Sequence, residues 1–200
     1  MRFVFLFFFV FNLNAQQSYI DYLSPYHPTV SNKGMVVTQN NLSSDVGIEI
    51  LNKGGNAIDA AVAVGFSLAV TLPRAGNLGG GGFMLVYLKE KDEIFYIDYR
   101  SKSPLNASID NIFDLNGKNI SPVDFSDDIY DKTRYGYKAP AIPGTVAGLL
   151  EAHEKFGSLP LEEVLAPAIR QANEGILVSY DLEKAIDDTH QLKKDPESLR

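Results

Sequence analysis

The chain contains no cysteine. This absence excludes disulfides, a thiol nucleophile and a cysteine zinc site, so the fold must be held by its core. The 18 basic residues form no block and are outnumbered by 25 acidic ones, for a formal net charge of −7. This balance argues against nucleic acid as a partner. The densest basic feature is the pair Lys193-Lys194, which is typical of a solvated helix end.

A hydrophobic run long enough to cross a membrane is also missing. The apolar run from Phe3 to Phe11 has nine residues and follows the positive charge of Arg2, whereas a helix needs about 20 to cross a ~30 Å hydrocarbon core. The pattern predicts a cleaved secretory signal over residues 1–15, ending at the small residue Ala15. It predicts no stable membrane span and a periplasmic or secreted location. The sequons at Asn41, Asn106 and Asn119 would matter only in a eukaryotic secretory pathway.

Hydrophobic periodicity predicts a mixture of helices and strands after an exposed, polar leader at residues 16–33. Helices are expected at 42–53, 57–70, 144–156, 161–173 and 181–188, and strands at 35–38, 83–88 and 93–99. The last two strands should form an antiparallel hairpin, and residues 106–137 a long surface excursion. Without a regular β-α-β alternation, the order favours a layered α+β fold with an antiparallel sheet.

Glycines crowd the segment from Gly76 to Gly82, between a predicted helix and a predicted strand. A phosphate cradle has the opposite order, because it leads from a strand into a helix N-terminus. The glycines therefore predict a turn with positive φ and close backbone approach rather than a phosphate site. A direct ligand contact remains the alternative.

Arg100 follows the second predicted hairpin strand and is the main candidate for a binding residue. Its planar guanidinium can hold a carboxylate through two hydrogen bonds. The alternative is an ordinary ion pair with Asp98, Asp131 or another acidic residue. The histidines, His27, His153 and His190, lack the spacing of metal ligands, so no metal site is expected.

Several ordered motifs resemble the γ-glutamyltranspeptidase (glutathione hydrolase) family over about residues 34–188. They are Gly54–Ala63, Ala75–Phe83, Ile97–Arg100, Pro143–Leu149, Lys155–Gly157 and Leu161–Gly175. The resemblance implies that residues 34–200 are the incomplete N-terminal part of a large subunit. The implied fold is the four-layer αββα sandwich of N-terminal nucleophile hydrolases, of which this chain is only the N-terminal portion.

By the same resemblance, Arg100 binds the α-carboxylate of a γ-glutamyl group. The precursor cleaves itself, and a new N-terminal threonine on the small subunit transfers the group from glutathione to water or an amino acid, without a cofactor. That threonine belongs to a Thr-Thr-His-type segment that this sequence does not contain, and Thr145 lacks its context. We therefore expect no catalytic residue in this chain and no activity from it alone. The family pattern Arg-Glu-x-Ala-Pro is altered here, with Ser101 and Ser103 in place of Glu and Ala.

Three functions remain open at this point. The first is γ-glutamyl transfer and hydrolysis. The second keeps the fold but changes the substrate, as in a cephalosporin-type acylase or a polyglutamate transpeptidase. The third is a truncated, inactive protein with a binding or structural role.

Signal cleavage is directly testable. We expect processing immediately after Ala15, so that Gln16 begins the mature protein. N-terminal sequencing of the exported protein measures this, and a mature protein that retains Met1 or Arg2 would contradict it.

Overall fold

The computed structural model describes residues 30–108, 134–136, 139–190, 192–194 and 196–198. The chain divides into two compact units, Met1–Gly34 and Met35–Arg200. The predicted signal at 1–15 and most of the leader at 16–33 lie outside the described residues and remain predictions. Most of the predicted excursion at 106–137 also lies outside them. No helix in the described part of the chain is long and apolar enough to span a bilayer.

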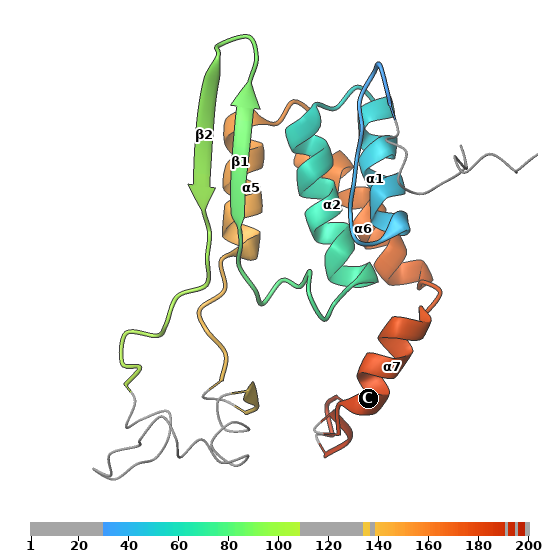
Figure 1. Ribbon diagram of the computed structural model, residues 1–200, viewed down its shortest axis with the longest axis vertical. Helices are drawn as coiled ribbons and strands as arrows, with labels where there is room; N and C mark the ends of the chain where they lie inside the picture. The colour runs from blue at the N-terminus through green and yellow to red at the C-terminus, as the bar shows by residue number, and fades with distance from the viewer. Residues whose placement is uncertain (1–29, 109–133, 137–138, 191, 195, 199–200) are drawn as a thin grey trace, which may run out of the picture. The chain divides into compact units, whose positions relative to one another are not determined.

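The described part of the second unit is a mixed α and β structure of helices and one β-hairpin (Figure 1). Its elements are α1 (Asn41–Asn52), α2 (Ala57–Thr71), β1 (Phe83–Leu88), β2 (Glu93–Asp98), α5 (Thr145–Phe156), α6 (Leu161–Glu174), α7 (Tyr180–Asp188) and the 3-10 helix η1 (Leu192–Lys194). All five predicted helices and the hairpin are confirmed, with boundaries that differ by at most one residue at either end.

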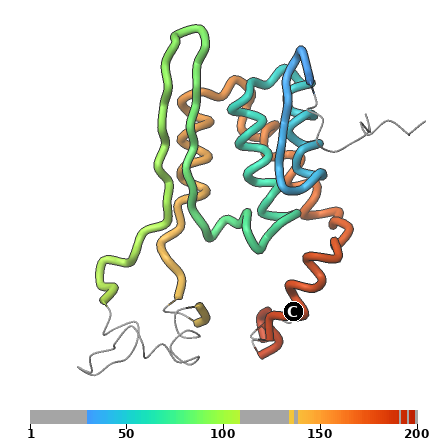
Figure 2. The backbone as a smooth tube through the Cα atoms, in the orientation of Figure 1, coloured from blue at the N-terminus to red at the C-terminus, as the bar shows by residue number. Residues whose placement is uncertain are grey.

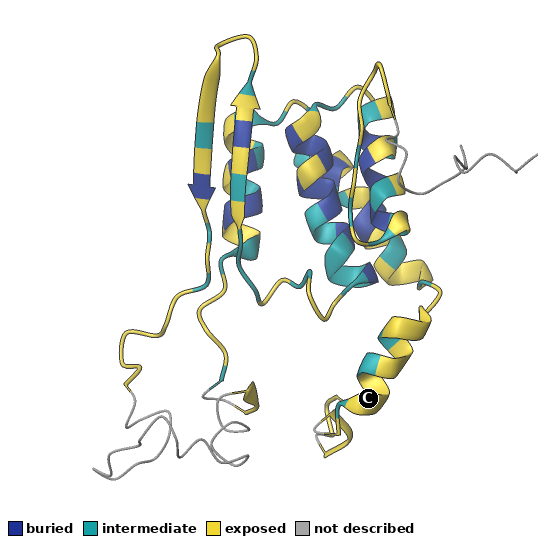
Figure 3. Ribbon diagram, in the orientation of Figure 1, coloured by how far each residue is buried: buried dark blue, intermediate teal, exposed yellow. Residues whose placement is uncertain are grey.

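Helix α2 lies at the centre of the helical layer and contacts α1, α5 and α6. The residues of α2 are apolar nearly all round the helix, which explains its position, because a helix without a polar face must be covered on most sides. Val62 and Ala63 are fully buried, as are Ile50 of α1 and Val164 of α6. Burying a side chain the size of Val or Ile contributes roughly 1.5–3 kcal/mol. Figure 3 shows these buried faces turned toward one another.

A chain of buried hydroxyls connects α1, α2 and α6 within this apolar contact. Ser67 Oγ donates to Gln171 Oε1 at 2.7 Å. Because a hydroxyl has one proton, Ser43 must donate to Ser67 at 2.8 Å, and Thr71 to Ser43 at 2.7 Å. The Gln171 amide then donates to the Leu42 carbonyl at 3.4 Å. Each hydroxyl in this hydrogen-bonded series has a partner, so none of these donors is buried without an acceptor.

The predicted strand at 35–38 is wrong. Residues 35–38 are extended, but they pair with no strand in the described part of the protein. Instead, the segment lies along α1, where the Val36 side chain occupies the space that a Cβ on Gly47 would need. Thr38 Oγ1 contacts Ser44 Oγ at 2.9 Å. The mostly β-branched segment 35–38 therefore packs against a helix, although the same residues could equally have paired in a sheet.

Asn40 and Asn56 begin α1 and α2. Asn40 accepts a hydrogen bond from Leu42 N–H at 2.9 Å, and Asn56 accepts from Ile58 and Asp59. Asp59 returns the contact by accepting from Asn56 N–H at 2.9 Å, which completes a capping box. Asn56 is therefore the N-cap of α2, and Asp59 completes the capping box.

Asp59 also joins the start of α2 to the connection between α5 and α6. The carboxylate is fully buried. It accepts from Ser158 N–H at 3.0 Å and Ser158 O–H at 2.6 Å, and from Leu159 N–H at 3.4 Å. His153 Nε2 lies 3.7 Å from Asp59 Oδ1 and 2.9 Å from the Leu159 carbonyl. Burial by itself raises the pKa of Asp59, but the hydrogen bonds from Ser158, Asn56 and Leu159 outweigh it and hold the pKa below the ordinary value of an aspartate.

The β-hairpin has one buried and one exposed face. Phe83, Leu85 and Tyr87 lie opposite Asp98, Tyr96 and Ile94 in the register. All of these side chains are exposed, as Figure 3 shows in yellow. Val86 and Ile97 on the other face are buried, and β2 contacts α5. Burial alternates along both strands, and the hairpin presents an uncovered apolar face.

We expect Asp59→Asn to destabilise the protein by about 2–4 kcal/mol, because the buried cluster loses the negative charge and one of the two acceptor oxygens of the carboxylate. Ionised Asp59 stabilises the fold above the ordinary Asp pKa, and this contribution is lost as pH falls through the lowered folded-state pKa. The difference in Tm between wild type and variant should therefore be full at about pH 6 and shrink below about pH 4. Exposed Asp45→Asn is the matched control. A difference that stayed constant across this range would contradict the assignment.

Candidate functional site

Arg100 lies immediately after β2, at the point where the hairpin meets α5 and the glycine segment. The residue is exposed, and its backbone N–H donates to Asp98 Oδ1 at 2.9 Å. Within the described part of the chain, the guanidinium forms no ion pair. The alternative pairing with Asp98 is thus not observed, and Asp131 lies outside the described residues.

Three backbone segments converge next to Arg100. Tyr99 and Gly82 extend the hairpin ladder with N–H to carbonyl bonds of 3.1 and 3.2 Å. The Gly80 carbonyl accepts from Gly144 N–H at 2.8 Å and Thr145 N–H at 3.2 Å. Helix α5 has no side-chain cap, so the glycine segment satisfies its first N–H groups. Figure 2 shows the path from α2 through this segment into β1.

The glycines of this segment are required for close approach. A Cβ on Gly81 would overlap the Ser101 nitrogen and lie 2.7 Å from the Tyr99 carbonyl oxygen. A Cβ on Gly144 would overlap the same carbonyl. The predicted close approach is confirmed, but the predicted positive φ is wrong, since no glycine from Gly76 to Gly82 has one. The requirement is space between backbones, not a left-handed turn.

A bridge between Lys102 and Ile142 extends the junction beyond Arg100, with N–H to carbonyl distances of 3.1 and 2.8 Å. Ser101 is half-buried and Ser103 is exposed. Arg100 is therefore flanked on both sides by paired backbone: Tyr99 with Gly82, and Lys102 with Ile142. The exposed guanidinium of Arg100 suits a carboxylate ligand. The paired backbone holds the start of its side chain, and no counter-ion among the described residues competes for the charge.

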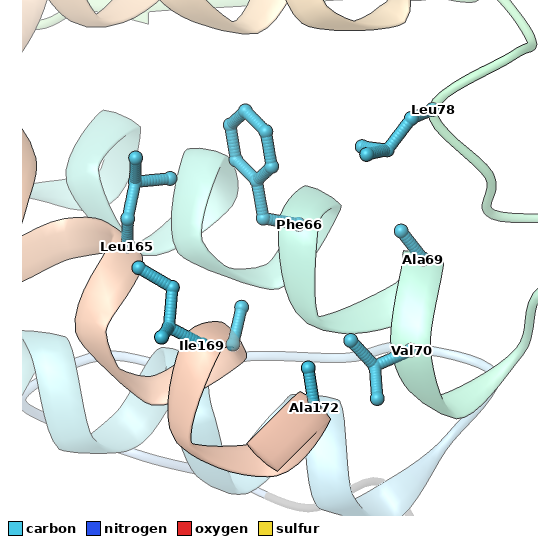
Figure 4. A pocket seen from close by; sticks show the side chains of 8 residues that line it. Phe66, Ala69, Val70, Leu78, Leu165, Ile169 and Ala172 are labelled. Atoms are coloured by element: carbon cyan, nitrogen blue, oxygen red, sulfur yellow. The ribbon is translucent and has the colours of Figure 1, made fainter.

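Arg100 lines neither of two cavities in the described part of the protein. An apolar cavity of about 280 Å³ lies between α2 and α6, with Leu78 of the glycine segment at its edge (Figure 4). Its lining is Phe66, Ala69, Val70, Leu78, Leu165, Ala168, Ile169 and Ala172. A second space of about 350 Å³ lies between the start of α2 and the hairpin turn. The first offers no polar partner, so it does not suit a charged amino-acid group.

Thr145 and His153, two other polar candidates, have structural roles. Thr145 is half-buried at the first turn of α5, and its N–H donates a hydrogen bond to the Gly80 carbonyl. His153 packs in the Asp59 cluster, His190 is exposed, and His27 lies outside the described residues. Among the described residues, no group of three His, Cys, Asp or Glu side chains could hold a metal ion.

Tyr99 is the residue of this junction that sequence reasoning missed. Gly148 and Gly144 lie one turn apart on α5, and a Cβ on Gly148 would overlap the Tyr99 ring. Burial raises the pKa of Tyr99 above its ordinary value. The only sequence signal for this contact was the i, i+4 spacing of the two glycines, which places them on one helix face.

Gly81→Ala and Gly79→Ala separate close approach from glycine content. A Cβ on Gly79 would meet only Asn77 Oδ1, at 3.4 Å. We expect Gly81→Ala to destabilise by about 1–3 kcal/mol through overpacking, and Gly79→Ala to be neutral or slightly stabilising. Thermal melting of the two variants measures this. Equal melting temperatures would contradict the close-approach account.

Comparison with known proteins supports the resemblance stated above. The Gamma-glutamyltranspeptidase family model matches residues 43–200. The glutathione hydrolase proenzyme of Pseudomonas sp. (strain A14) is 41% identical over 169 residues, which cover 84% of this chain and 28% of that proenzyme. The acylase ACY 1 proenzyme of Pseudomonas sp. (strain V22) is 38% identical over 177 residues, which cover 88% of this chain and 31% of that proenzyme. The chain thus spans less than a third of these relatives.

Solved structures agree with the sequence relatives. The crystal structure of Helicobacter pylori gamma-glutamyltranspeptidase superimposes with a TM-score of 0.75 at 35% identity, covering 86% of this chain and 47% of that one. This chain belongs to the gamma-glutamyltranspeptidase family and matches an N-terminal portion of its proenzymes.

Proposed function

We propose that the protein containing this chain is a γ-glutamyltransferase and glutathione hydrolase, and that Arg100 anchors the α-carboxylate of the γ-glutamyl group. The observation that carries the proposal is the placement of Arg100: an exposed guanidinium without an ion-pair partner in the described part of the chain, on a backbone paired on both sides. The 41% identity to a glutathione hydrolase proenzyme supports the choice of substrate.

In the proposed reaction, a threonine outside this chain attacks the γ-carbonyl carbon of the bound substrate. The amide C–N bond breaks, the amine leaves with a proton, and an acyl-enzyme ester remains. Water releases glutamate from this ester, or an amino acid accepts the γ-glutamyl group. Arg100 holds the far end of the acyl group throughout, so that the carbonyl stays aligned with the nucleophile. The chemistry requires no metal or organic cofactor.

The proposal includes the rest of the fold. The uncovered face of the hairpin carries Phe83, Leu85, Tyr87, Ile94 and Tyr96, each more than half exposed. A face of this kind marks a contact with further protein. We assign it to the second sheet of a four-layer αββα sandwich, contributed by the remainder of the precursor after self-cleavage. The predicted secretory signal places the enzyme in the periplasm or outside the cell.

The acylase alternative rests on the 38% identity to an acylase proenzyme. The two functions differ in the acyl group that they accept. A preference for γ-glutamyl anilide over glutaryl anilide, which lacks the α-amine, favours the transferase, and the opposite preference favours the acylase. The coding sequence beyond the codon for Arg200 tests the remaining alternative. A Thr-Thr-His-type segment there supports an enzyme, and an authentic stop codon supports a binding or structural role.

Arg100→Ala in the full-length protein tests the anchor. Loss of a charge-assisted Arg–carboxylate contact costs about 2–5 kcal/mol of binding. The value of kcat/KM for γ-glutamyl anilide should therefore fall roughly 30-fold to several thousandfold. Arg100→Lys keeps the charge but loses the planar fork, so its loss should be smaller.

Two controls accompany this measurement. Self-cleavage should survive both substitutions, because it involves no free substrate carboxylate. 4-Aminobutyryl anilide, which lacks the α-carboxylate, should react about equally poorly with wild type and variants. If Arg100→Ala equals wild type on γ-glutamyl anilide, Arg100 is not the anchor.

A further inference from the structure

We propose that Tyr99 is the positioning residue for Arg100, because its ring fills the space between Gly82 and Gly148. The inference rests on the proposed anchoring role of Arg100. Tyr99 itself contacts no substrate in this account. It acts by fixing the backbone from which the Arg100 side chain starts.

The ring of Tyr99 is held by two glycines from different elements. A Cβ on Gly82 would lie 2.8 Å from the ring Cε2 and 3.2 Å from the phenol oxygen. On the helix side, a Cβ on Gly148 would overlap Tyr99 Cβ and the ring itself. The ring therefore occupies a slot that exists only because both positions lack a side chain. Gly148 is buried on α5, so one wall of the slot belongs to a packed helix.

The backbone of Tyr99 is held as firmly as its ring. Its N–H and carbonyl both pair with Gly82, and its carbonyl oxygen occupies the space that a Cβ on Gly144 would need. Gly144 and Gly148 form a flat face on one turn of α5, and Tyr99 lies on that face. The Cα of the next residue, Arg100, can move little while these contacts last.

Arg100 depends on such a support because its own side chain has none in the described structure. A bidentate guanidinium contact requires placement within about 0.5 Å and 10–20°. Buried polar partners usually hold a guanidinium with that precision. For Arg100, the backbone at Tyr99 must provide this support. The phenol contributes little, since its O–H lies 3.4 Å from the Phe83 carbonyl, which is long for a hydroxyl donor. The packing of the aromatic ring, and not the hydroxyl group, therefore holds the Tyr99 backbone in place.

A double-mutant cycle in the full-length protein tests the inference. Tyr99→Leu should raise KM for γ-glutamyl anilide about 10-fold to 100-fold, as expected for a misplaced binding group. The extent of self-cleavage should change less than about threefold, since that step involves no substrate carboxylate. Tyr99→Phe keeps the ring and should stay within about twofold of wild type. Tyr180→Leu, at a tyrosine that is 74% exposed on α7, is the matched control and should leave KM unchanged.

The decisive variant combines Tyr99→Leu with Arg100→Ala. If Tyr99 acts through Arg100, Tyr99→Leu causes no further rise in KM once Arg100 is alanine. Equal effects of Tyr99→Leu in the two backgrounds would overturn the inference, as would an unchanged KM for Tyr99→Leu alone. If instead Arg100→Ala leaves KM unchanged, the proposed anchor itself is wrong, which separates the two failures.

Gly82→Ala provides an independent variant in case Tyr99→Leu does not fold or self-cleave. Its methyl group meets the outer edge of the ring, so it should tilt the ring without emptying the slot. KM should rise as for Tyr99→Leu, and the rise should again vanish in the Arg100→Ala background. A Gly82→Ala protein with wild-type KM would overturn the inference.

Discussion

The close approach of three backbones around Tyr99 is the constraint on which the candidate site depends. The glycine segment, the end of the hairpin and the start of α5 meet at distances that leave no room for a Cβ at Gly81, Gly144 or Gly148. The segments are joined by backbone hydrogen bonds, which cap α5 and extend the hairpin at once. Because Gly80 caps α5 and Gly82, two residues further on, extends the hairpin, the helix and the sheet cannot shift independently. The direction of Arg100 follows from this coupling.

The helical layer supplies the support that this junction requires. Helix α2 leads directly into the glycine segment, so its position determines where the segment begins. The hydroxyl chain from Thr71 to Gln171 fixes α2 against α1 and α6, and Asp59 fixes its other end to the α5–α6 connection. Both clusters bury polar groups with every partner present. Such clusters tolerate few alternative arrangements, because any shift would leave a donor or acceptor unpaired in the core.

The sequence predicted the local elements well and the long-range contacts poorly, for a physical reason. Helix caps, periodicity and the hairpin depend on residues a few positions apart, and Asn56, Val62 and Ile97 behave as their patterns indicate. The extended run at 35–38 failed because a β-branched segment fits either a sheet or a helix surface. The glycine segment was assigned close approach correctly but positive φ wrongly, since both uses give the same composition. The contacts of Asp59 with Ser158 and of Tyr99 with Gly148 span 99 and 49 positions, and no local pattern encodes them. Arg100 was identified from its strand position and from the family resemblance, whereas its support was invisible.

Ser101 and Ser103, which depart from the family pattern, alter the surroundings of Arg100 but not the contacts of its backbone. Replacing Glu and Ala by serine alters charge and hydrogen bonding next to Arg100. The backbone there is held by Gly82, Gly81 and the Lys102–Ile142 bridge, none of which involves those two side chains. In particular, the Gly81 backbone packs against the Ser101 nitrogen, which every residue type except proline presents in the same form. The substitutions therefore change the electrostatic surroundings of the guanidinium while leaving its attachment in place. In the proposed anchoring role, Arg100 would thus keep its backbone position, with a different set of polar neighbours around the bound substrate.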